Sequence, residues 1–151
     1  MARAASDLTS HLGYWLRYVS NHVSQGFARK LEKRDVTVAE WVILRELYGA
    51  GPVAPSRLAD RLGLTRGAVT KLADRLIAKS LLARRASLAD GRAQTLALTA
   101  QGRLIVPALA ALADQNDAEF FSHLNAAERN ELERILRDIV ARRGLKSVPV
   151  T

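Results

Sequence analysis

The sequence contains no cysteine among its 151 residues, and it has only three histidines. The lack of thiols excludes disulfides, thiolate metal sites, cysteine nucleophiles and redox sensing through cysteine. The histidines, His11, His22 and His123, lie far apart, and no pair of histidine and acidic residues at i, i+4 spacing has a third ligand at hand for a zinc site. We therefore expect neither a metal ion nor another cofactor.

Long hydrophobic runs are also missing from the sequence. The longest run, residues 104–113, contains Pro107 and is far too short to cross a bilayer. Residues 1–7 lack the apolar segment of a signal peptide. These absences predict a soluble, cytoplasmic protein without a membrane partner.

The sequence has no recognisable catalytic pattern. Serine, histidine and aspartate occur, but no nucleophile elbow or other activating context accompanies them. Gly49-Ala-Gly51 follows a predicted helix and no strand, so it indicates a helix terminator and not a phosphate-binding loop. Glu128, Glu131 and Glu133 fit a solvated helix face better than a catalytic pair. We therefore predict that the protein is not an enzyme.

Positive charge is plentiful and unevenly placed. The net charge is +8, and residues 57–103 hold ten basic and three acidic residues, so seven of the eight excess charges fall in this third of the chain. Such a concentration is typical of a surface that neutralises phosphates. On charge alone, a nucleic-acid interface and a solvated basic face are equally open.

The middle of the chain predicts a helix-turn-helix. Thr37-Val-Ala-Glu40 has the spacing of a capping box, and its helix should end before the Gly49-Ala-Gly51-Pro52 breaker. Pro55 opens a short helix that Gly63 terminates, and Thr65 can cap a longer helix over residues 66–79. The short glycine-containing turn between these two helices is the signature of the motif.

The hydrophobic period changes after this motif. Residues 82–86 and 94–98 have strand character and flank a polar loop with Asp90-Gly91 at its tip, which predicts a hairpin, or wing. Thr99 then caps another long helix. We predict a mainly α fold with a small β-wing: a winged helix-turn-helix DNA-binding domain over residues 35–103, with a helical dimerisation region in residues 1–34 and 104–151.

Hydrophobic stripes mark the two outer helices. Residues 8–31 carry apolar side chains at helical spacing, and a final helix follows the Asn125–Glu128 capping box, with a tail expected to fray beyond Gly144. A small winged domain needs no such helices for its own core, so we predict that the stripes pair across a two-fold axis. Folding back onto their own subunit is the alternative. The interface candidates are Leu8, Leu12, Leu16, Leu132, Leu136 and Ile139.

The longer helix of the helix-turn-helix has a polar face opposite its apolar stripe. This face carries Arg66, Gly67, Thr70 and Lys71 near its N-terminal end, where such a helix meets base edges in the major groove. Arg66 and Lys71 can donate to guanine, and Thr70 can meet a thymine methyl group. An ordinary solvent face is the alternative, which the neighbouring short helix and basic hairpin disfavour.

Several motifs, in this order, resemble the MarR family of bacterial transcriptional regulators. They are Leu64-Thr-Arg-Gly-Ala-Val-Thr-Lys-Leu-Ala-Asp-Arg-Leu76, Leu81-Leu-Ala-Arg-Arg85, Asp90-Gly-Arg92 and Leu98-Thr-Ala-Gln-Gly102, with Leu12-Gly-Tyr-Trp-Leu-Arg17 and Thr37-Val-Ala-Glu40-Trp41 before them. The resemblance covers nearly the whole chain and departs from the family at Ser80, where glycine is usual. It implies a sequence-specific dimeric regulator, a repressor or an activator, on an inverted-repeat operator in double-stranded DNA. A winged-helix module that binds proteins and not DNA is the alternative.

The resemblance also assigns roles in the wing. Arg92 would enter the minor groove, and Asp90 would hold the wing against the recognition helix with Arg75 as its partner. Arg84 and Arg85 would lie along the phosphates, or remain solvated strand charges. The DNA-binding candidates are Arg57, Thr65, Arg66, Gly67, Thr70, Lys71, Arg75, Arg84, Arg85, Asp90 and Arg92.

A small-molecule effector is implied as well. Many members of the family bind aromatic acids between the dimerisation helices and the winged domain, and binding changes the distance between the two DNA-binding domains of the dimer. His11, Tyr14, Trp15, Arg17 and Tyr18 could line such a site, with Arg17 as the anion partner. An aromatic core of the dimer interface is the alternative for these residues.

Overall fold

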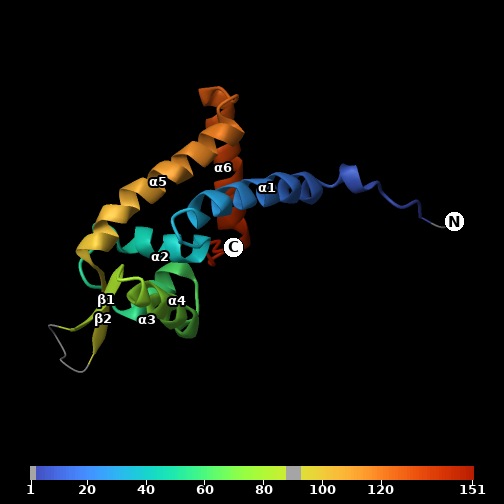
Figure 1. The fold of residues 1–151 in the computed structure, drawn as a ribbon. Coiled ribbons are helices and arrows are strands. Elements are labelled where there is room, and N and C mark those ends of the chain that lie inside the picture. The colour runs from blue at the N-terminus through green and yellow to red at the C-terminus, as the bar shows by residue number, and fades with distance from the viewer. Residues whose placement is uncertain (1–2, 88–92) are drawn as a thin grey trace.

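The computed structural model describes residues 3–87 and 93–151. In chain order, its elements are a short 3-10 turn (Leu8–Ser10), α1 (Leu12–Glu32), α2 (Val38–Leu47), α3 (Pro55–Leu62), α4 (Arg66–Ala78), β1 (Leu82–Ala86), β2 (Gln94–Leu98), α5 (Ala100–Phe121) and α6 (Ala126–Arg143). Figure 1 shows α2, α3 and α4 gathered in one lobe with the strands at its edge, while α1, α5 and α6 extend away from it. The predicted fold class, mainly α with a two-stranded wing, is confirmed.

The predicted helix caps are present. Thr37 Oγ1 accepts from the Glu40 N–H at 3.1 Å, and Glu40 Oε1 accepts from the Thr37 N–H at 2.9 Å. Asn125 closes the same kind of box at the start of α6. Gly63 ends α3 with φ +64°, a left-handed conformation that favours glycine. These helix ends could be predicted because each depends on residues that are neighbours in the sequence.

The N-terminal helix begins later than its hydrophobic spacing predicts. His11 is extended, with φ −96° and ψ 127°, so it separates the 3-10 turn from α1. The Trp15 indole N–H donates to the Thr9 carbonyl at 2.9 Å and holds this turn beside the helix. The prediction of one helix from residue 8 is wrong, and Leu8 lies outside the α1 stripe.

The hydrophobic core lies in the winged lobe. Leu44, Leu58 and Leu76 are fully buried there, together with Leu96 of the wing. The strands pair antiparallel, and a further pairing that the sequence did not predict joins Val53 to Leu96 through N–H···O bonds of 2.9 and 2.8 Å. This pairing fastens the segment before α3 to the base of the wing.

Helix α1 packs closely against α5 at Gly26, opposite Asn116 and Phe120. A Cβ atom on Gly26 would lie 2.9 Å from Asn116 Oδ1, so a larger residue at position 26 would displace the Asn116 side chain. Asn116, itself buried, donates to the Val23 carbonyl at 3.1 Å and accepts from Lys30 Nζ at 3.0 Å. Lys30 also pairs with Glu119 at 2.8 Å. Hydrogen bonds and an ion pair thus set the position of α5 on α1.

Helix α6 buries none of its residues within the chain. Its stripe residues Leu132, Leu136 and Ile139 are 40, 39 and 44% exposed, and Leu12 and Leu16 of α1 are 88 and 53% exposed. The stripes therefore do not fold back onto their own subunit. They remain available for pairing with a second copy.

The chain beyond α6 does not fray. The Val148 N–H donates to the Leu62 carbonyl at 2.9 Å, and Ser147 Oγ donates to the Gly63 carbonyl at 3.0 Å. Val148 is partly buried against the core. The prediction of a frayed tail is wrong because these donors find acceptors at the end of α3.

Within residues 3–87 and 93–151, no helix combines the length and the apolarity needed to cross a membrane.

Candidate nucleic-acid interface

The polar face of α4 is exposed along its first two turns. Val69, Leu72 and Leu76 anchor the opposite face in the core, while Arg66 and Lys71 are exposed. Thr65 Oγ1 caps the helix by accepting from the Ala68 N–H at 3.1 Å. The anchored stripe fixes the helix rotation, so the polar face must point away from the lobe.

Gly67 and Thr70 leave open space between the longer side chains of this face. A Cβ atom on Gly67 would meet no heavy atom within 4 Å, so the lobe itself does not require glycine there. Thr70 is exposed one turn later. A face with two cations, a hydroxyl and an open glycine can approach a groove of nucleic acid closely.

Helix α4 is terminated by Ser80, which adopts the left-handed conformation that usually favours glycine. Ser80 has φ +62°, the Leu81 N–H donates to the Leu76 carbonyl at 2.9 Å, and the Ser80 N–H donates to the Ile77 carbonyl at 2.9 Å. This is the left-handed helix stop for which glycine is favoured. Ser80, which replaces the glycine usual in the family, therefore keeps the geometry of the turn but strains its backbone.

The start of α5 is locked to that stop. Thr99 Oγ1 donates to the Ser80 carbonyl at 2.7 Å and accepts from the Gly102 N–H at 3.0 Å. A Cβ atom on Gly102 would lie 2.2 Å from the Leu81 carbonyl oxygen, so only glycine fits. The Leu98-Thr-Ala-Gln-Gly102 motif thus joins the recognition helix, the wing and α5 at one point.

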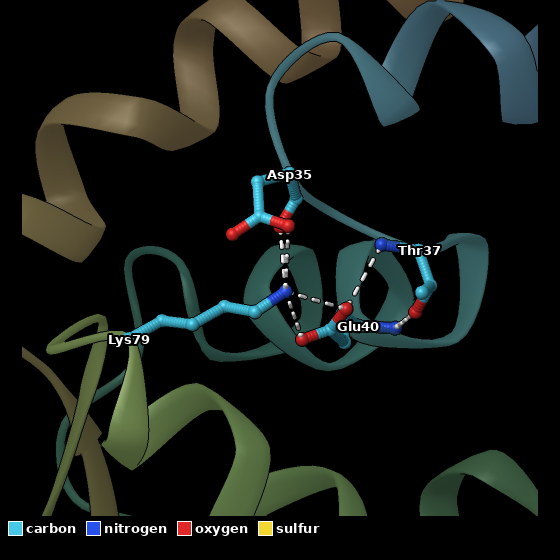
Figure 2. A network of polar contacts seen from close by, with 4 residues as sticks. All are labelled: Asp35, Thr37, Glu40 and Lys79. Carbon is cyan, nitrogen blue, oxygen red and sulfur yellow. Dashed lines mark hydrogen bonds and ion pairs between the residues drawn. The ribbon is translucent and has the colours of Figure 1, made fainter.

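An ion-pair network holds the end of α4 against the start of α2. Figure 2 shows the Lys79 ammonium between the Asp35 backbone carbonyl, at 2.6 Å, and both carboxylate oxygens of Glu40, at 3.1 and 3.0 Å. Glu40 is 1% exposed. Burial raises the pKa of this carboxyl, but hydrogen bonds from the Thr37 backbone and from Lys79 outweigh it, and the net pKa is lowered. The carboxylate therefore stays charged as the anchor of Lys79.

The wing is tied to the recognition helix by a pair that the sequence analysis missed. Arg84 of β1 forms an ion pair with Asp74 of α4. The family resemblance implies this role for Asp90 and Arg75 instead. Asp90 lies outside the described residues, and Arg75 makes no ion pair among those described. Residue spacing alone does not show which strand position faces α4, because that depends on the hairpin register.

Most of the predicted DNA-binding cations form no ion pair in the part of the chain that the structure describes. Among residues 3–87 and 93–151, no ion pair engages Arg57, Arg66, Lys71, Arg75 or Arg85, and all five side chains are exposed. Arg92 lies outside the described residues. These cations on α3, α4 and the wing are therefore free to contact an anionic ligand.

Four of the five effector candidates surround one hollow at the start of α1. This hollow has a volume of about 510 Å³ and is lined in part by His11, Tyr14, Arg17 and Tyr18. Tyr14 and Tyr18 contact edge to face, with ring centroids 5.9 Å apart. Trp15 does not line it, since its indole is bonded to the preceding turn. Two aromatic rings beside an exposed guanidinium suit an aromatic anion.

A second hollow, which the sequence analysis did not anticipate, lies between α1, α2, α5 and the C-terminal tail. Its volume is about 380 Å³, and Phe27, Trp41 and Val148 are among its lining residues. None of the lining residues is basic, and Asp117 is among them. The site is formed by four separate segments, so no single motif could indicate it. Among the described residues, no cluster of histidine and acidic side chains could hold a metal ion.

Comparisons with known proteins agree with this geometry. The model of the MarR family matches residues 34–93. The transcriptional repressor MdtR of Bacillus subtilis is 32% identical over 100 residues, which are 66% of this chain and 64% of MdtR, so the match spans slightly less than two thirds of that relative. A crystal structure of a mutant MarR from Escherichia coli with operator DNA is 27% identical, with a TM-score of 0.78 over 89% of this chain and 99% of that one. A structure of Bordetella bronchiseptica BpsR, from work on regulation of its DNA binding by 6-hydroxynicotinic acid, is 26% identical, with a TM-score of 0.78 over 90% and 97%.

Proposed function

The chain belongs to the MarR family, and we propose that it is a transcriptional repressor that binds operator DNA as a homodimer. Residues 35–103 are the DNA-binding domain, and residues 1–34 and 104–151 carry the dimerisation helices. In this account the protein acts in the cytoplasm as a regulator and not as an enzyme. A small aromatic acid releases it from DNA.

The observation that carries the proposal is the exposed polar face of α4. Arg66 and Lys71 project from a helix whose rotation is fixed by three buried residues on its other side. Neither cation has an ion-pair partner among the described residues, so both are free to contact phosphates or guanine edges. The Arg84–Asp74 pair sets the wing beside this helix, where Arg85 can reach the flanking backbone.

The uncovered stripes of α1 and α6 support the homodimer. They place large apolar side chains, among them Leu12, Leu16 and Leu136, in solvent in the isolated chain. A second copy related by a two-fold axis would cover them and would present two α4 helices to one duplex. The operator is then an inverted repeat with half-site centres about 34–36 Å apart, or one helical turn.

Gel-shift titration with the DNA upstream of the protein's own gene tests this function. The unaltered protein should shift that duplex in preference to a scrambled one. Arg66→Ala and Lys71→Ala should weaken the shift, by about 1–3 kcal/mol if the side chain reads a base. Arg143→Ala, which removes an exposed charge at the end of α6, is the control. Equal affinity of all four proteins for both duplexes would favour the alternative, a winged-helix module that binds proteins.

The hollow at the start of α1 is our proposed effector site. It contains Arg17 beside Tyr14 and Tyr18, whereas the lining of the second hollow contains an acidic and no basic residue. An aromatic carboxylate is therefore better accommodated at α1. Binding there would act on the dimer interface and change the spacing of the two recognition helices.

Tryptophan fluorescence distinguishes the two hollows, because the chain has two tryptophans. Trp41 lines the second hollow, and the Trp15 ring lies 5.1 Å from the ring of Tyr14, which lines the first. Trp41→Phe leaves only Trp15, next to the α1 hollow, and Trp15→Phe leaves only Trp41. Titration with 6-hydroxynicotinate should change the emission of Trp41→Phe and leave that of Trp15→Phe constant. The reverse pattern would place the effector in the second hollow.

A further inference from the structure

The segment after α6 connects a dimerisation helix directly to the turn of the helix-turn-helix. Three and four residues after Gly144, Ser147 Oγ donates to the Gly63 carbonyl at 3.0 Å and the Val148 N–H donates to the Leu62 carbonyl at 2.9 Å. These two acceptors are the last residue of α3 and its left-handed stop. The tail is therefore attached two residues before Thr65, the cap of the recognition helix.

The contact is closely packed as well as hydrogen-bonded. A Cβ atom on Gly63 would lie 2.5 Å from the Lys146 carbonyl oxygen and 2.8 Å from the Ser147 Cα atom. Both of these are backbone atoms, which cannot rotate away as a flexible side chain can. The tail backbone thus fits against position 63 only because glycine is there.

Helix α6 has few contacts within the chain, since none of its residues is buried in the part that the structure describes. Its stripe residues Leu132 and Leu136 share an open hollow with Phe121 and Leu124 at the end of α5. Its first turn is linked to α5 by the Arg129–Asp117 ion pair at 2.7 Å, which is exposed and weak. Its other end is held by the tail at Gly63. The angle between α6 and the winged lobe is therefore defined largely by these two attachments.

We propose that residues Lys146–Val148 are a strap that fixes the angle between α6 and α4, and so sets the distance between the two recognition helices of the homodimer. This proposal rests on the proposed function, because α6 must be part of the dimer seam for its angle to matter. The strap positions the DNA-reading helix without contacting DNA.

A matched pair of glycine substitutions separates the strap from the helix stop. Gly63 and Gly144 are both left-handed, at φ +64° and +60°, and asparagine tolerates that conformation. Gly63→Asn adds a Cβ atom against the tail, whereas a Cβ atom at Gly144 meets nothing within 4 Å. Chains that end at Leu145 or at Pro149 give a second comparison, since only the longer one keeps both hydrogen bonds.

Spin labels can report the distance between the winged lobes of the two subunits. The chain has no cysteine, so Asp60→Cys on the exposed side of α3 gives one label in each subunit. Pulsed electron–electron double resonance should give one narrow distance distribution for the labelled parent, for Gly144→Asn and for the chain ending at Pro149. It should shift or broaden for Gly63→Asn and for the chain ending at Leu145.

Two other outcomes would contradict either the strap or the homodimer. An unchanged distribution in Gly63→Asn and in the chain ending at Leu145 would overturn the strap, even if their melting temperatures fall, because the tail would then add only stability. If the labelled parent shows no distance between subunits, the homodimer is wrong, and the proposed function and the strap fail together.

Discussion

The Lys79 ammonium lies 3.0 Å from Glu40 Oε2, so the last residue before the Ser80 stop is paired with a carboxylate buried at the start of α2. The same ammonium bonds to the Asp35 carbonyl in the loop between α1 and α2. One side chain therefore connects the recognition helix to the junction between the dimerisation helix and the winged lobe.

Loss of Lys79 should destabilise the fold strongly. In Lys79→Met, Glu40 keeps its burial but loses its cation, and an uncompensated buried charge is costly. Because the Lys79 side chain is 27% exposed and partly screened, we expect a loss of roughly 2–4 kcal/mol in the free energy of unfolding. Urea denaturation measures it. Lys33→Met, at an exposed lysine, is the control and should change stability little, and an equal loss in both variants would contradict the role of the pair.

Glu40 should also make stability depend on pH. Its folded pKa is lowered, so its contribution is complete above the unfolded value of about 4.5 and is lost as the pH falls below that value through the folded pKa. Glu40→Gln removes this contribution. Between about pH 6 and pH 3, the variant should lose less unfolding free energy than the parent protein. Parallel curves for the two proteins would show that Glu40 is not held charged by the network.

The sequence predicted those parts of the fold that depend on neighbouring residues. The Thr37 and Asn125 capping boxes, the Gly63 stop and the wing strands follow from local chemistry, and all are present. The contacts that were missed join distant segments: Val53 with Leu96, and the tail with Gly63. No periodicity indicates such pairs, because each depends on how whole elements pack.

The candidate site also combines features that depend on neighbouring residues with contacts between distant segments. The polar face of α4 could be predicted, since burial of Val69 and Leu72 determines which side chains point outward. The Arg84–Asp74 link could not, because it depends on the register of the hairpin and on how the hairpin packs against α4. The tail beyond Gly144 was expected to fray because chain termini commonly do, and its hydrogen bonds to α3 determine its position instead.

Relief of backbone strain at Ser80 should stabilise the protein. Ser80→Gly keeps the carbonyl that accepts from Thr99 and removes the Cβ atom that is unfavourable at φ +62°. We expect a gain of about 1 kcal/mol, which a chemical-denaturation midpoint can resolve. Ser122→Gly is the control, since Ser122 has a right-handed φ of −65° and glycine there only adds chain entropy to the unfolded state. A loss of stability in Ser80→Gly would mean that the hydroxyl contributes more than the strain costs.

The dimer seam can be tested by a charge placed in its apolar stripe. Leu136→Glu should convert the dimer to monomers and abolish operator binding, because pairing α6 would bury an unpaired carboxylate. Leu136 is 39% exposed in the single chain, so the fold itself should survive the change. Analytical ultracentrifugation gives the assembly state, and circular dichroism confirms the fold. Asn130→Glu, an exposed position of α6 outside the stripe, should remain dimeric; a dimeric Leu136→Glu would place the seam elsewhere.

The salt dependence of operator binding tests the central claim most directly. If the unpaired cations of α3, α4 and the wing neutralise phosphates, each contact releases a counterion, and the association constant must fall steeply as salt rises. For a dimer making about 6–10 phosphate contacts, fluorescence anisotropy should show a loss of about 10³–10⁵ in affinity between roughly 50 and 200 mM salt. An affinity for the inverted-repeat duplex that hardly changes over this range would contradict a DNA-binding role for this surface.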